Sequence, residues 1–139
     1  MANMDVYKSI EAKIISYFST NWTYTSVQYP NVTFDPNNLN SWAQIHIIPI
    51  SRRRLCLGGN NDTGQLTKGT LVVNLFTRQG TGTGVIKDLV THAMDLFNYA
   101  EIVIDSGETI HFEEARSESG VIDGNFWKEV VKCNFLLLI

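Results

Sequence analysis

Three consecutive arginines form the densest charged cluster of this sequence, and guanidinium groups bind phosphate or carboxylate oxygens. They are Arg52, Arg53 and Arg54. The cluster begins a segment, Ser51–Thr67, that is rich in glycine and asparagine and separates two apolar runs. Connections of this length within a compact domain are usually functional or disordered. The segment is therefore predicted to be a surface that meets another macromolecule, with a solvated loop as the alternative.

The predicted interface extends to the tip of this segment and to acidic residues elsewhere. Its further members are Gly58, Gly59, Asn60, Asp62, Gly82, Glu113, Glu114 and Glu118. Residues 51–78 carry five basic side chains and one acidic one, whereas residues 101–123 carry seven acidic side chains and one basic one. Copies of a chain with two such segments attract each other head to tail, and this kind of contact closes rings.

Residue types that perform catalysis or bind metals occur here without the required spacing. The histidines His46, His92 and His111 form no i, i+4 pair of the kind that binds zinc on a helix. Glu113 and Glu114 are neighbours on a predicted strand, so they are expected to point to opposite faces rather than to act as a carboxylate pair. The sequence predicts no catalytic residue, no metal ligand and no cofactor, and an enzyme is the least favoured class.

The stretch Gly80–Gly84 resembles a phosphate-binding loop, because three glycines alternate with threonines. It lacks the lysine and the hydroxyl residue that end a P-loop. We therefore predict a flexible connection into a helix, with Thr81 or Thr83 as the N-cap.

Composition limits the class of protein further. The chain has 139 residues, the size of one domain (1–139), and 44% of them are hydrophobic, which suffices for a substantial core. A formal net charge of −3 argues against a generally basic nucleic-acid-binding protein. Cys56 and Cys133 have no metal-ligand spacing and are predicted to be free thiols. No apolar run has the length of a membrane span, and no signal-peptide core precedes the first helix.

Two helices and several strands are predicted to position these residues. Residues 4–18 and 86–97 carry apolar side chains at spacings of three and four, which is typical of helices with one buried face. Strands are predicted at residues 42–50, 70–76, 101–104, 109–115 and 125–139, and a loop at residues 117–124. This order predicts an α+β fold in which a mostly antiparallel sheet packs against two helices and a long hairpin protrudes around Ser51–Thr67.

The pattern within each strand indicates which faces are buried. In residues 42–50, Ala43 and Ile45 share one face, and Trp42 lies on the other. Residues 70–76 are almost all apolar and are predicted to be central in the sheet. In the last strand, Glu129 is expected among apolar residues on one face.

Short motifs appear in a characteristic order along nearly the whole chain. They are Thr20-Asn21-Trp22-Thr23, Val27-Gln28-Tyr29-Pro30-Asn31 with Phe34 after it, a strand led by Trp42, Leu57-Gly58, Gly69-Thr70-Leu71-Val72-Val73, and a Gly-Thr-Gly connection into the second helix. This order resembles the tail-terminator, or tail-completion, proteins of long-tailed bacteriophages. The family often has a single arginine before a glycine within Ser51–Thr67, whereas this chain has Gly64-Gln65-Leu66 after Asp62-Thr63.

The resemblance implies a structural virion protein that forms a hexameric ring of identical subunits. Such a ring caps the head-proximal end of the tail tube, stops polymerisation of the tube protein and presents its other face to a head-completion or neck protein. DNA would pass through the lumen without specific binding, no membrane would take part, and assembly would occur in the host cytoplasm. Two alternatives remain open: a head-completion or neck protein that bridges portal and tail, and a nucleic-acid-binding module that uses the arginines.

Overall fold

The computed structural model describes residues 3–54, 65–105 and 107–138, which form two helices and one six-stranded sheet. The elements are α1 (Asn3–Asn21), β1 (Ser26–Gln28), β2 (Ser41–Arg54), β3 (Gln65–Arg78), α2 (Gly84–Phe97), β4 (Glu101–Val103), β5 (Thr109–Asp123) and β6 (Phe126–Leu138). The strands lie in the order β1-β2-β3-β6-β5-β4, and every neighbouring pair except β1 and β2 is antiparallel. The predicted α+β class with a mostly antiparallel sheet is confirmed.

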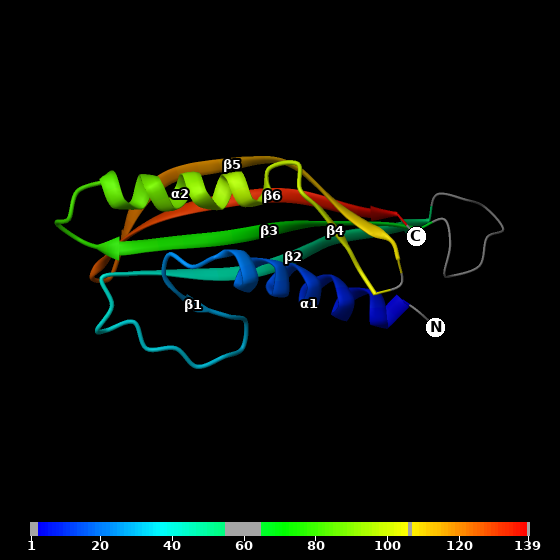
Figure 1. The fold of residues 1–139 in the computed structure, drawn as a ribbon, viewed down its shortest axis with the longest axis horizontal. Helices are drawn as coiled ribbons and strands as arrows, with labels where there is room; N and C mark the ends of the chain where they lie inside the picture. Colours follow the sequence, from blue (N-terminus) through cyan, green and yellow to red (C-terminus); the bar gives the residue numbers. More distant parts are fainter. Residues whose placement is uncertain (1–2, 55–64, 106, 139) are drawn as a thin grey trace.

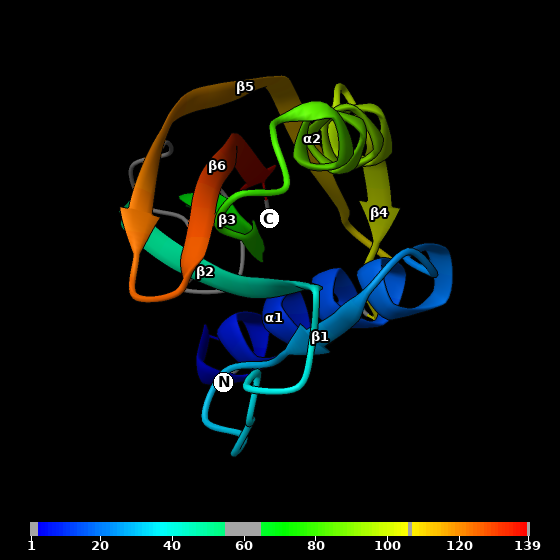
Figure 2. The ribbon, with the colours of Figure 1, turned by 90° about the vertical axis from the view of Figure 1, so that its left-hand side faces the viewer.

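Four long strands run along the length of the molecule, as Figure 1 shows. A view along the strands shows that the sheet curls across its width, with both helices on the same side of β2, β3 and β6 (Figure 2). The strand β3 lies between β2 and β6, and its residues 71–77 are all buried. The central position predicted for this apolar run is therefore confirmed.

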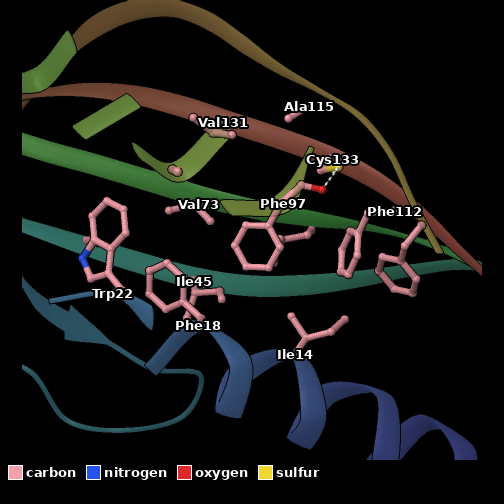
Figure 3. Packing of buried hydrophobic residues seen from close by; sticks show 14 of the residues in the cluster. Ile14, Phe18, Trp22, Ile45, Val73, Phe97, Phe112, Ala115, Val131 and Cys133 are labelled. Carbon is pink, nitrogen blue, oxygen red and sulfur yellow. Dashed lines mark hydrogen bonds between the residues drawn. The ribbon is translucent and has the colours of Figure 1, made fainter. Parts of the chain in front are cut away.

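The main hydrophobic core lies between the helices and the sheet. Ala43, Ile45 and Val73 are fully buried there, as the alternation in β2 predicted. The buried residues of α2 are Ile86, Leu89, Val90, Ala93 and Phe97, which confirms the predicted apolar stripe of this helix. Figure 3 shows Phe97 among side chains that come from α1, β2, β3 and β5. One continuous core therefore joins both helices to the sheet.

A second, smaller cluster lies on the opposite face of β2. Trp42 stacks on Phe76 with 3.8 Å between ring centroids, and Phe126 meets both rings edge-on. Phe34 and Leu39, from the segment before β2, pack against this cluster. Trp42 therefore lies on the opposite face from Ala43, as the sequence predicted.

Two predicted loops are wrong in part, because strand pairing continues through them. Residues 117–124 were expected to form a loop, but β5 extends to Asp123 and pairs with β6 up to the partners Asp123 and Phe126. Likewise, Arg52, Arg53 and Arg54 belong to β2 and pair with residues 65–67 of β3. Turn-forming residues are tolerated in a strand when the neighbouring strand supplies hydrogen-bond partners, and the register shift between Glu118 and Val121 absorbs the irregularity in residues 117–124.

Candidate assembly interface

The described residues of the predicted interface are spread over the sheet rather than gathered in one site. Gly58, Gly59, Asn60 and Asp62 lie outside the described residues. The three arginines end β2, and Arg54 pairs with Gln65 at the start of β3. Gly82 follows the other end of β3. Because β3 has 14 residues, its two ends lie roughly 45 Å apart at about 3.3 Å per residue.

The acidic candidates Glu113, Glu114 and Glu118 lie on β5, and all three are exposed. The register shifts between Phe112 and Ala115, both of which are buried. This bulge interrupts the alternation of side chains along β5. The prediction that Glu113 and Glu114 point to opposite faces assumed a regular strand, and that assumption is wrong. Glu118 forms an ion pair with Lys132 at 3.1 Å, whereas Glu113 and Glu114 have no ion pair among the described residues.

Both outer sides of the sheet are open over long stretches. The short β1 pairs with β2 only from Trp42 to Gln44. The short β4 pairs with β5 only at residues 109–111. The residues just before β4 also form hydrogen bonds with β5, and the last of these runs from the N–H of Ala115 to the side-chain oxygen of Asn98. Beyond these partners, residues 45–54 of β2 and residues 116–123 of β5 have no outer strand within the described chain. We call these stretches the β2 edge and the β5 edge.

An open pocket of about 310 Å³ lies at the end of the sheet that carries Gly82. Its lining residues are Arg78, Gln79, Gly80, Gly82, Thr83, Ile122 and Trp127. Ile122 and its neighbour Val121 are exposed hydrophobic residues at the tip of the β5–β6 hairpin. The structure therefore brings the Gly82 connection together with this hairpin, a proximity that sequence reasoning missed because the two are 40 residues apart.

A buried carboxylate fixes the wall of this pocket. Glu129 is only 1% exposed, as its place among the apolar residues of β6 predicted. Its two oxygens accept hydrogen bonds from Nζ of Lys87, at 2.7 Å, and from Nε1 of Trp127, at 2.9 Å. Lys87 on α2 was not predicted as a partner. The signal in the sequence was a single glutamate, Glu129, on an otherwise apolar face. Because buried charges are paired, such a residue indicates that a cation lies near it.

Gly120 on β5 lets the Trp127 ring lie against the backbone. A Cβ atom at this position would lie 2.2 Å from Cζ2 of Trp127. We expect Gly120→Ala to lower the free energy of unfolding by about 1–3 kcal/mol, because the indole must move and weaken its bond to Glu129. Urea denaturation followed by tryptophan fluorescence measures this loss.

The matched control is Gly84→Ala, because an added Cβ there meets no atom within 4 Å and no positive φ is involved. It should leave the unfolding midpoint nearly unchanged. Equal midpoints for the two variants would show that Trp127 does not depend on the close approach at Gly120.

Two titratable side chains of the sheet have shifted pKa values. Burial, and secondarily Lys128, lower the pKa of His46. Burial, and secondarily Glu113, raise the pKa of Cys133 to about 11, so its free thiol stays protonated at neutral pH. Among the described residues, no three His, Cys, Asp or Glu side chains are grouped to hold a metal ion. No helix in the same ranges has the length and apolarity to cross a membrane.

Open sheet edges, an exposed acidic strand and an apolar hairpin tip are surface features that suit contact with other proteins. A family model for phage tail terminator proteins matches residues 7–135. The chain therefore belongs to the phage tail terminator family, which is a family of structural proteins of the bacteriophage tail. The suspected family is confirmed.

Comparison with solved structures agrees on the fold. Five solved chains match, and one of them superposes with a TM-score of 0.71 at 12% identity. The alignment covers 96% of this chain and 94% of that chain, whose name states no function. At this identity the likeness concerns the fold alone. No curated protein matches.

Proposed function

We propose that this chain forms a hexameric ring that caps the head-proximal end of the tail tube, stops polymerisation of the tube protein and provides the surface for joining the head. Membership of the tail terminator family carries this proposal. A terminator must bind one ring of tube subunits and refuse the next, which requires two unlike faces. DNA would pass through the lumen without specific contacts.

The two ends of the long strands supply unlike surfaces for this role. One end carries the arginines of β2, and the other carries the pocket beside Gly82 and the exposed Ile122. Figure 1 shows the two ends separated by the length of the sheet. If the long strands run roughly along the tail axis, the β2–β3 end would contact the protein on one side of the ring. The Gly80–Gly84 connection would contact the protein on the other side.

Deletion of residues 58–64 tests the first of these contacts. The deleted chain should fold, because Arg54 and Gln65 already pair and the three residues that remain between them suffice to close a hairpin. It should fail to cap. Tube protein polymerised with the intact chain should give short tubes in electron micrographs, and with the deleted chain tubes as long as those grown alone.

A chain in which the same seven residues are replaced by glycine and serine is the control for loop length. Circular dichroism and the unfolding midpoint verify the fold of both variants. Tubes of normal capped length with the deleted chain would contradict a role for this segment. If the intact chain fails to limit tube length but binds particles that carry the head connector, the head-completion or neck alternative replaces capping.

A further inference from the structure

We propose that the β2 edge of one subunit pairs with the β5 edge of the next, so that the sheets join into one continuous sheet around the assembly. The partner is a second copy of this chain. The inference rests on the ring of the proposed function and assigns the surfaces that close it. Contacts of this kind are heterologous, and repeated rotation closes them into a ring.

The two edges suit each other in length and direction. The β2 edge has ten residues and the β5 edge eight, or roughly 33 Å and 26 Å of extended chain. Within one sheet, β2 and β5 run in opposite directions, because each of the three pairs that link them is antiparallel. Rotation about an axis along the strands preserves these directions, so the new pair would be antiparallel, the more stable arrangement.

The edges are offset along the strands, and this offset sets the geometry of the assembly. Residue pairing places Arg116, at the start of the β5 edge, in the same row across the sheet as His46, near the start of the β2 edge. From this row the two edges extend toward opposite ends. Pairing therefore staggers neighbouring subunits, and closed sheets accommodate such a stagger by tilting their strands about 35–45° from the axis.

Charge favours pairing of a β2 edge with a β5 edge over pairing of two like edges. In an antiparallel pair, the three arginines that end the β2 edge lie opposite the start of the β5 edge, where Glu113, Glu114 and Glu118 outnumber Arg116. Two β2 edges repel each other, as do two acidic strands, while the mixed pair attracts. Pro49 and the register shifts of both strands also hinder indiscriminate strand addition. Charge and strand direction thus favour this pair of edges.

Charge exchange between two chains tests this pairing. One variant carries Arg52→Glu, Arg53→Glu and Arg54→Glu, and the other carries Glu113→Lys, Glu114→Lys and Glu118→Lys. Each alone should lose the oligomer, because every junction would bring like charges together. An equimolar mixture should restore the original mass with the two chains alternating, which an even-membered ring allows. Native mass spectrometry and sedimentation at low salt, with and without tube protein, measure both results.

The matched controls reverse exposed charges on the helices, Lys8→Glu and Asp88→Lys, and should keep the original mass. Hydrogen exchange should slow at least tenfold in the backbone amides of both edges on assembly. The inference is overturned if each charge variant assembles like the original chain, if mixing restores nothing, or if the arginine variant loses only tube binding. Edge-paired rings that do not cap tubes would refute the proposed function and leave this inference standing.

Discussion

A chain with alanine in place of Phe97 is expected to lose about 3–5 kcal/mol of its free energy of unfolding. Phe97 is fully buried at the end of α2. Its ring lies 6.1 Å from that of Phe18 on α1 and 5.3 Å from that of Phe112 on β5. One side chain therefore holds both helices to the sheet (Figure 3). Typical domains have 5–15 kcal/mol in total, so the loss is a large share.

Urea denaturation followed by circular dichroism measures this loss, and thermal melting should show a midpoint roughly 10–20 °C lower. Phe97→Leu should recover most of the stability because it retains most of the buried volume. Val85→Ala on the same helix is the exposed control and should change the unfolding free energy by less than about 0.5 kcal/mol. Equal stability of the Phe97→Ala and Val85→Ala chains would mean that α1 and α2 are held by other contacts.

Lys87→Met is expected to destabilise the fold by about 2–3 kcal/mol, since it leaves the Glu129 carboxylate buried without its cation. The side chain of Glu129 is 2% exposed, whereas that of Lys87 is 62% exposed. Water can partly replace the ammonium group, so the expected loss lies below that of a fully buried pair. Chemical denaturation of the single variant measures it.

A double-mutant cycle separates the ion pair from the packing of the lysine stem. Glu129→Gln keeps an acceptor for Nε1 of Trp127 and removes the charge. The double variant, Lys87→Met with Glu129→Gln, should be more stable than Lys87→Met alone, because no unpaired charge remains buried. If Lys87→Met costs the same in both backgrounds, the interaction between Nζ and the carboxylate contributes nothing and the loss comes from the stem.

Features that depend on local periodicity follow from the order of the residues alone. The apolar stripe that ends at Phe97 predicted α2, and the uniformly apolar run of residues 70–76 predicted a central strand. Alternation around Ala43 and Trp42 predicted two opposed faces, and the position of Glu129 predicted a buried carboxylate. In each case the apolar and polar pattern within a single helix or strand indicates which of its faces is buried. Residues close together in the sequence are therefore sufficient for the prediction.

Contacts between residues far apart in the sequence become apparent only in the folded chain. The extension of β5 through Gly120 depends on β6 as a pairing partner. The turn-forming residues of this segment do not indicate that β6 lies beside it. The same holds for the arginines that continue β2, for Lys87 opposite Glu129, and for Gly82 beside the β5–β6 hairpin. Pairing across a sheet is set by contacts between segments far apart in sequence, and it overrides local turn preference because a paired strand satisfies its backbone hydrogen bonds.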